Sequence, residues 1–263
     1  MRVLVTRPEP ECAAWVQGLR ARGVAAAAWP LIRIGPVRDP TAVHRCWRQL
    51  AGFQAVMAVS GAAVEHFFAL RPPDTPLPSG LRFWAPGPGT RAALERLQVP
   101  ASRIDAPAAA SGQFDSEALW RVVGPTVKPG WRVLIVRGGD ASPEEDAPAP
   151  SAGQGREWLA QTLGQAGARV ELVMAYERGA VPWTASQRAE AAAACSDGSL
   201  WLFTSSQAIA HLAAALPGQT LAQARALATH PRIAEAARAA GFGRLWETRP
   251  RLDDVVASIE SIA

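Results

Sequence analysis

The chain has 263 residues, of which 49% are hydrophobic and 19% charged, a composition that indicates a globular protein and excludes disordered or fibrous classes. No apolar run is long enough to cross a bilayer, because Arg, Pro, Gly or Glu interrupts every candidate. The net charge is +4, and nearly all of the cationic residues are arginines. Their abundance indicates either a compositional bias or the binding of an acidic small ligand. Because they are spread along the chain and not clustered, they argue against a nucleic-acid partner.

The first half of the chain alternates short apolar strands with amphipathic helices. A strand over 2–7 leads into a helix that begins near Pro8 and ends before Gly23, and an extended stretch follows over 24–34. Residues 35–40 contain two prolines and a glycine, and predict a domain boundary. The other elements predicted here are a helix at 41–50, strands at 53–59 and 82–86, helices at 62–70 and 91–97, and a capped helix within 111–123, with Asp115 or Ser116 as its cap.

The second half continues the alternation from a strand at 131–137. Residues 138–155 contain almost no apolar side chain larger than alanine, so they predict a surface loop. A second boundary is predicted at 179–183, GAVPW. The remaining predictions are helices at 156–166, 185–195, 206–215, 232–240 and 253–262, and strands at 169–178, 200–204, 225–229 and 244–248. This alternation predicts an α/β fold with parallel sheets covered on both faces.

Three segments occur twice in the chain. The pairs are VLVTR at 3–7 with VLIVR at 133–137, VSGAAVEHF at 59–67 with TSSQAIAHL at 204–212, and APGPGTRAAL at 85–94 with ATHPRIAEAA at 228–237. The pairs indicate a duplicated α/β unit, and function is expected in a cleft between two similar halves.

Small, hydroxyl-bearing or cationic residues follow the predicted strands. Ligands of open α/β sheets bind beyond the carboxyl ends of the strands, where helix starts favour anions. Each turn alone is also explained by ordinary helix capping, but the set is harder to explain that way. The turns are Thr6-Arg7, Ser60-Gly61, Gly87 to Thr90, Arg137-Gly138, Thr204 to Ser206 and Thr229-His230.

Several familiar catalytic patterns are missing from the sequence. GPGT at 87–90 has no Gly-Lys-Ser/Thr ending, and neither GxGxxG after the first strand nor GxSxG occurs. Three scattered cysteines and four histidines lack ligand spacing, so we expect reduced thiols and no metal site. His66 and His211 occupy matching positions of the repeat, which favours a structural role for both.

Tyr176 is the only tyrosine, although the chain has ten tryptophans. It lies close to the second predicted boundary. One interpretation is an aromatic residue that covers a hinge; the other is a phenol that faces the cleft and donates a proton to a leaving group.

The ordered motifs resemble those of the uroporphyrinogen-III synthase family. They are VLVTRPEP, PLIRI, VSGAAV at 59–64, APGPGT at 85–90, VLIVRG followed by GREWLAQTL, AYER at 175–178 and FTSSQAI at 203–209. The resemblance spans nearly the whole chain and rests on the order of individually weak motifs. It implies an α/β fold of two similar three-layer parallel-sheet domains, flavodoxin-like, joined by two extended linkers.

The resemblance also implies where the chain divides and what it does. Domain one would be 1–36 plus 179–263 and domain two 40–174, with linkers near 35–40 and 175–183. The implied reaction is that of a cofactor-independent, cyclising hydro-lyase of tetrapyrrole (haem) biosynthesis. It closes hydroxymethylbilane to uroporphyrinogen III, with loss of water and inversion of the last pyrrole ring.

The resemblance implies a role for most of the turn residues. Tyr176 would assist departure of the hydroxyl. The substrate's eight carboxylates would be bound by Ser60, Thr90, Ser205 and Ser206, by the backbone of Gly61, Gly87 and Gly138, and by the cations Arg7, Arg137 and Arg232. Anchoring of the contact between the domains is an equally good interpretation of Arg7. His230-Pro231 departs from the family's usual Gly-Pro turn, which puts the role of His230 in doubt, and the 139–154 insertion is atypical.

Two other functions stay open at the level of sequence. One is a non-catalytic relative of the same fold that binds a tetrapyrrole or another polyanion. A weaker one is a two-domain glycosyltransferase, which the short chain and the missing nucleotide-binding carboxylate disfavour. The expected setting is a cytoplasmic monomer with a small-molecule substrate and neither a nucleic-acid nor a membrane partner.

Overall fold

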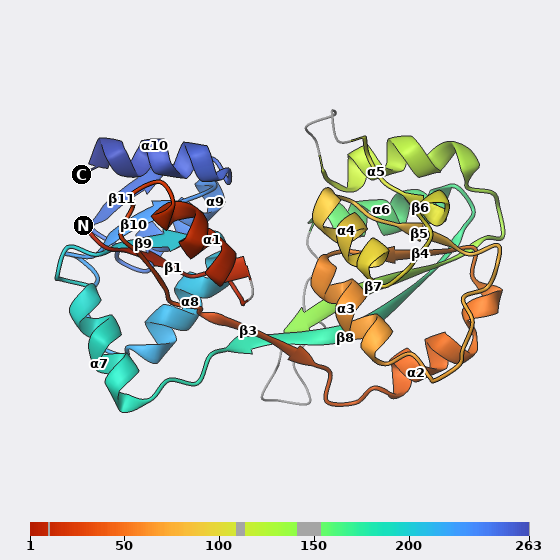
Figure 1. The fold of residues 1–263 in the computed structure, drawn as a ribbon, viewed down its shortest axis with the longest axis horizontal. Helices are drawn as coiled ribbons and strands as arrows, with labels where there is room; N and C mark the ends of the chain where they lie inside the picture. Colours follow the sequence, from red (N-terminus) through yellow and green to blue (C-terminus); the bar gives the residue numbers. More distant parts are fainter. Residues whose placement is uncertain (10, 109–113, 141–153, 263) are drawn as a thin grey trace. The chain divides into compact units, whose positions relative to one another are not determined.

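The computed structural model describes residues 1–9, 11–108, 114–140 and 154–262 (Figure 1). The chain forms two compact units. Unit 1 comprises Met1–Ile34 and Gly179–Ala263, and unit 2 comprises Gly35–Arg178. The chain therefore passes from one unit to the other twice, and unit 2 is inserted into unit 1.

Unit 1 is built on a five-stranded sheet in the order β11-β10-β9-β1-β2, with every printed pairing parallel. Its strands are β1 (Val3–Val5), β2 (Ala26–Ala28), β9 (Leu200–Phe203), β10 (Arg225–Ala228) and β11 (Arg244–Glu247). Its helices are α1 (Glu11–Arg20), α7 (Ala185–Ala194), α8 (Ser206–Ala215), α9 (Pro231–Ala239) and α10 (Leu252–Ile262).

Unit 2 contains a six-stranded sheet in the order β3-β8-β7-β4-β5-β6. The strands are β3 (Ile32–Pro36), β4 (Ala55–Ala58), β5 (Arg82–Trp84), β6 (Ile104–Asp105), β7 (Arg132–Asp140) and β8 (Arg169–Ala180). The helices are α2 (Thr41–Arg48), α3 (Gly61–Ala69), α4 (Pro88–Arg96), α5 (Ser116–Val123) and α6 (Gln154–Gln165), with short 3₁₀ turns at Leu50–Gly52, Ala101–Arg103 and Gly124–Thr126. β3 and β8 begin in one unit and end in the other.

The two sheets have the same plan. When the five strands of unit 1 are numbered by their order along the chain, their order across the sheet, starting at β2, is 2-1-3-4-5, which is typical of flavodoxin-like folds. In unit 2 the strands β8-β7-β4-β5-β6 occupy the same five positions. Of these five, the chain forms the strand of the third position, β4, first. Each repeated sequence segment occupies the same place in both sheets: β1 matches β7, β9 with α8 matches β4 with α3, and β10 with α9 matches β5 with α4. The predicted α/β fold with two similar parallel-sheet domains is confirmed.

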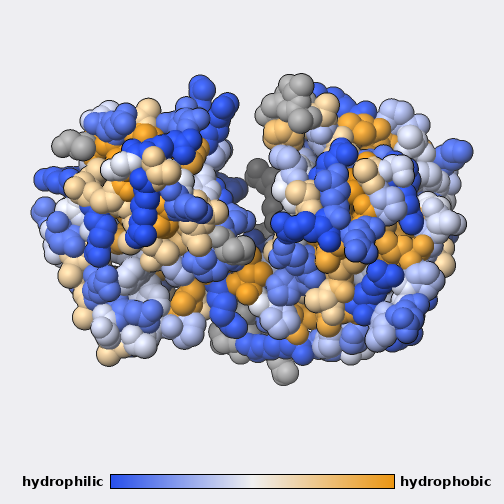
Figure 2. All heavy atoms as spheres, viewed as in Figure 1, coloured by the Kyte–Doolittle hydropathy of each residue, from blue (hydrophilic) through white to orange (hydrophobic). Residues whose placement is uncertain are grey.

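Both faces of the sheet in unit 1 are buried under helices (Figure 1). Val3 and Val5 pack with α1 and α10 on one face, whereas Leu4 and Trp201 pack with α8 and α9 on the other. Successive side chains of a strand point to opposite faces, so a strand that is covered on both sides must be apolar throughout. Hydrophilic residues are spread over the visible outer face of each unit (Figure 2).

Several local predictions were wrong. The first helix begins at Glu11 and not near Pro8. The extended stretch predicted at 24–34 contains two strands, of which the second continues to Pro36. The fourth helix begins at Pro88, because Gly87 serves as its N-cap. Strand β7 continues to Asp140, so the first three residues of the predicted 138–155 loop are strand; the rest of that loop up to 153 lies outside the described residues.

Candidate active site

Tyr176 lies on β8 next to an irregularity in the pairing with β7. Arg137 pairs with Met174, but the next residue, Gly138, pairs with Tyr176, so Ala175 is an extra residue in β8. Such a bulge changes the direction in which the following side chain points. In a regular strand Tyr176 would share a face with Met174, which is 37% exposed, whereas its own exposure is 5%.

The glycines opposite the bulge show which face Tyr176 has reached. A Cβ built on Gly139 would meet the Met174 side chain, and a Cβ on Gly138 would overlap ring carbons of Tyr176 and lie 2.8 Å from its Oη. Consecutive residues of a strand face opposite sides, so Met174 and Tyr176 lie on opposite faces of the sheet. Gly138 leaves the space that the phenol ring occupies.

The phenol of Tyr176 contacts two residues of the segment that follows β4. The Ser60 Oγ lies 3.3 Å from the Tyr176 Oη, a distance at which either atom can be the donor. The same Ser60 Oγ caps α3 by accepting a hydrogen bond from the Ala63 N–H at 3.2 Å. The His66 ring stacks on the phenol with a centroid distance of 5.7 Å, and burial lowers the pKa of this imidazole.

The other predicted residues of unit 2 lie at the same edge of the sheet, because β8, β7, β4 and β5 are neighbours. Gly61 is the first residue of α3 and lies close to α4. A Cβ built on Gly61 would lie 3.8 Å from the Gly89 carbonyl oxygen. Gly87 caps α4 with extended backbone, and Thr90 in the first turn of that helix is 6% exposed. The predicted Arg137-Gly138 turn is wrong: both residues lie inside β7, so no helix begins there.

In unit 1, the helices α8 and α9 begin after the neighbouring strands β9 and β10, as α3 and α4 follow β4 and β5 in unit 2. Ser205 caps α8 by accepting from the Gln207 N–H at 3.2 Å, and Ser206 begins the helix with an Oγ that is buried and has no hydrogen-bond partner among the described residues. His230 caps α9, its Nδ1 accepting from the Arg232 N–H at 3.1 Å, which requires that this nitrogen carry no proton. The Arg232 side chain is exposed.

Arg7 follows β1, the strand beside β9, and is held against α1. Its guanidinium pairs with Glu11 at 2.6 Å and lies 4.4 Å from the centroid of the Trp15 ring. The side chain is only 18% exposed, and its Nε is buried without a partner among the described residues. These contacts lie within unit 1 and leave the charge of Arg7 at the end of β1, so both interpretations of Arg7 stay predictions.

The repeat now gives a direct comparison between the two units. Ser60 and Ser205 are equivalent N-caps, and the capping residues Gly87 and His230 are each followed by proline. Tyr176 has no equivalent, because β2, the counterpart of β8, ends at Ala28 and contains only alanines. Both units carry the anion-favouring helix starts, and one of them adds a phenol.

Comparisons with known proteins identify the family and the fold. The family model of uroporphyrinogen-III synthase HemD matches residues 13–257. The chain belongs to the uroporphyrinogen-III synthase family. Structures of two uroporphyrinogen III synthases are similar. One, a mutant from Thermus thermophilus, has 18% identity, coverage of 99% of this chain and 98% of that chain, and a TM-score of 0.55. The enzyme from Helicobacter pylori has 15% identity, full coverage of both chains and a TM-score of 0.51.

The expected resemblance to the uroporphyrinogen-III synthase family is therefore confirmed, and at these identities the solved structures support the fold. Within the described ranges, no group of three or more His, Cys, Asp or Glu residues is placed to hold a metal ion. Cys12, Cys46 and Cys195 are free and buried, and burial raises the pKa of Cys12 and Cys195 to about 11. No helix in the described part of the chain has the length and apolarity to span a membrane.

Sequence reasoning missed two parts of the Tyr176 environment. The backbone contact of Gly138 with a ligand stays a prediction, but the sequence did not show that its lack of a side chain accommodates the phenol ring. His66 was assigned a structural role in α3, and the contact with Tyr176 is specific to this copy. The glycine pair GG at 138–139 next to a strand was the available signal for both, since glycine in a strand marks bulges and close approaches.

Proposed function

We propose that this member of the family is a uroporphyrinogen-III synthase that converts hydroxymethylbilane to uroporphyrinogen III in tetrapyrrole biosynthesis. The observation that carries the proposal is the family match over residues 13–257. The Tyr176 environment supports it, because a loss of water needs a proton donor and this phenol is buried beside a polar helix start. We further propose a cofactor-independent lyase that acts as a cytoplasmic monomer, with neither a nucleic-acid nor a membrane partner.

The first chemical step breaks the carbon–oxygen bond of the substrate's hydroxymethyl group. The pyrrole nitrogen supplies the electron pair that expels the oxygen, and Tyr176 donates the proton that turns the leaving hydroxide into water. The resulting azafulvene is attacked by the substituted α-carbon of the last ring, which gives a spiro intermediate. The original bond between that carbon and the methylene of the neighbouring ring then breaks and leaves an azafulvene on the neighbouring ring. Its methylene carbon bonds to the unsubstituted α-carbon of the last ring, which inverts that ring. The proton lost when that ring becomes aromatic again restores the phenol, so the net change is loss of one water.

Ser60 positions the Tyr176 proton for this step. A serine hydroxyl has one proton to donate, and the Ser60 Oγ already accepts the hydrogen bond from Ala63. When Ser60 donates its proton to the Tyr176 Oη at 3.3 Å, the phenol proton is left for the substrate. Ser60 is thus a positioning residue in our proposal, in addition to its role at a helix start that favours carboxylates.

The carboxylates are bound by helix starts instead of a dense cluster of cations. Unpaired backbone N–H groups and the helix dipole favour anions at Gly61, Gly87, Ser205 and His230, and the free Ser206 hydroxyl adds a donor. Arg7, Arg137, Arg232 and Thr90 complete the set that we propose. Such fixed donors stabilise a charged, otherwise flexible substrate by positioning, so no strong nucleophile is required.

The decisive experiment is incubation with freshly prepared hydroxymethylbilane and separation of the product isomers. We expect the type III isomer; type I alone, at the rate of unassisted closure, would refute the synthase and favour a non-catalytic tetrapyrrole-binding relative. Tyr176→Phe keeps the ring and removes the proton donor, so turnover should fall by about 10²-fold or more. Loss of one neutral hydrogen bond should lower the free energy of unfolding by only about 1 kcal/mol. An unchanged rate would remove Tyr176 from the mechanism.

A further inference from the structure

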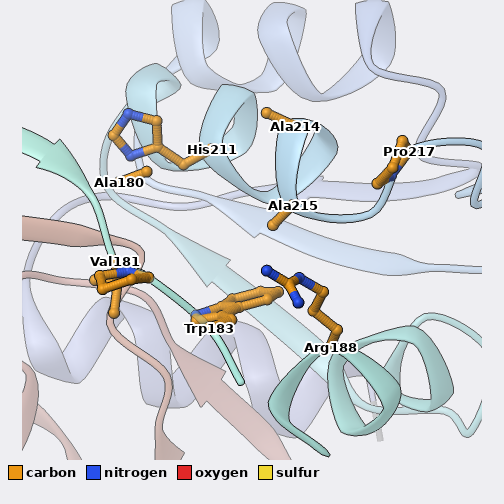
Figure 3. Close-up of a pocket in the computed structure, with 9 residues that line it drawn as sticks. Ala180, Val181, Trp183, Arg188, His211, Ala214, Ala215 and Pro217 are labelled. Carbon is orange, nitrogen blue, oxygen red and sulfur yellow. The ribbon is translucent and has the colours of Figure 1, made fainter. Parts of the chain in front are cut away.

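Unit 1 contains a pocket that none of the proposed site residues lines. Its volume is about 430 Å³, within the range of small-molecule sites. The lining comes from the end of β8 and the segment that follows it, from α7, and from α8 with Pro217 beyond it, all within 179–263 (Figure 3). Trp183, Val181, Ala214 and Ala215 make most of the surface apolar.

The tryptophan wall of the pocket is held in place. Trp183 is 9% exposed and packs edge-on against Trp29, with ring centroids 5.9 Å apart and planes at 76°. In Figure 3 the indole lies on the side of α7, opposite Ala214 and Ala215 of α8. A preformed apolar slot of this kind favours a flat, apolar ligand body.

Two basic side chains, His211 and Arg188, also line the pocket, and among the described residues no acidic side chain does. His211 Nδ1 lies 2.8 Å from the Leu31 carbonyl oxygen, which can only accept, so Nδ1 is the donor and Nε2 remains for other partners. Arg188, exposed on α7, makes no side-chain hydrogen bond or ion pair with any described residue. A guanidinium without a carboxylate partner, at the rim of an apolar slot, is suited to a carboxylate of a ligand.

We propose that this pocket binds an aromatic monocarboxylate of one or two fused rings, with the ring between Trp183 and the α8 alanines and the carboxylate on Arg188. The inference concerns unit 1 alone and does not rest on the proposed synthase activity. It adds a binding site to a face of unit 1 formed by α7 and α8, whereas the proposed carboxylate-binding residues of this unit lie at the starts of α8 and α9 and at the end of β1.

The test uses indole-3-propionate as the probe and its neutral amide as the comparison, with binding to the full chain measured by calorimetry and ligand-observed NMR. We expect the acid to bind about 10-fold more tightly than the amide, because a charge-assisted hydrogen bond replaces a neutral one. Arg188→Gln should lower the affinity for the acid by about 5–10-fold and leave the affinity for the amide unchanged. Arg244→Gln, which removes an exposed arginine of β11, is the matched control and should have no effect.

A second variant tests the position of the ring. Ala214 is exposed and lines the pocket, so Ala214→Trp fills the slot from the solvent side and should abolish binding without loss of folding, as checked by circular dichroism. Equal affinity of acid and amide, equal effects of Arg188→Gln and Arg244→Gln, or undiminished binding to Ala214→Trp would each overturn the proposal.

Discussion

Replacing Gly138 by alanine tests whether the space beside β7 positions Tyr176. The added methyl carbon would lie 2.8 Å from the phenol Oη and closer still to two ring carbons. Ordinary contacts between such atoms begin near about 3.5 Å, so the ring or the strand must move by about 1 Å. Gly138 is outside the left-handed backbone region, so alanine brings no backbone strain and the effect is steric.

The size of the expected effect follows from that displacement. Forcing one extra methyl into a packed site typically costs about 1–3 kcal/mol of stability. A catalytic group displaced by about 1 Å can lose about 10²-fold in rate. We therefore expect Gly138→Ala to reduce turnover about as much as Tyr176→Phe does, although the phenol is still present.

The assay combines the initial rate of type III formation with urea unfolding. Gly139→Ala is the matched control, because its methyl would meet the flexible end of Met174, which is 37% exposed and can turn away. The second control repeats Gly138→Ala in a Tyr176→Ala background, where the ring is absent and the added methyl should cost less than about 0.5 kcal/mol.

Two results would refute this reasoning. One is a wild-type rate for Gly138→Ala. The other is an equal loss of stability from Gly138→Ala with and without the Tyr176 ring, because the double-mutant cycle would then show no coupling between the two positions.

Two further variants separate stability from catalysis. Ser60→Ala and Ser205→Ala each remove one N-cap hydrogen bond and should each lower the free energy of unfolding by about 1 kcal/mol. Ser205→Ala should mainly raise KM, because Ser205 is proposed to bind a carboxylate, whereas kcat should fall much further for Ser60→Ala. Equal kcat values for the two variants would contradict the positioning role of Ser60. For His66, burial lowers the folded-state pKa below 6.5, so the unfolded state binds more protons and stability falls as pH drops below that value. When urea unfolding is measured at about pH 7 and at about pH 5.5, the free energy of unfolding should fall less for His66→Phe than for the wild type. Equal falls for the two proteins would show that protonation of His66 does not cause the loss.

The α/β class and the repeated units could be predicted because hydrophobic patterns and helix-start residues repeat with the elements. Ser60 and Ser205 are short polar residues directly before apolar helices, and both serve as N-caps. The apolar runs of β4, β7 and β9 indicate strands that are covered on both faces. Local chemistry of this kind does not depend on contacts made far along the chain.

The environment of Tyr176 could not be predicted in the same way. Strand alternation places it on the face of Met174, and only the extra residue Ala175 moves it to the face of Ser60 and His66. A bulge depends on the register between β7 and β8, which is set by packing across the whole sheet. The turn predicted at Arg137 was wrong for a local reason. The glycines that follow the apolar run indicated a turn, but the strand continues through them.

The insertion of unit 2 into unit 1 sets the order in which the chain can fold during synthesis. Unit 2 is one continuous segment, and its sheet can be completed once Arg178 has emerged. β1 cannot pair with β9 until Leu200 and Leu202 have been made, and Thr6 waits for a carbonyl acceptor 196 positions away. The apolar strand β1 therefore has only β2 beside it, and lacks β9, while the inserted unit folds. This makes unit 1 the slower half and the one more exposed to aggregation on the ribosome.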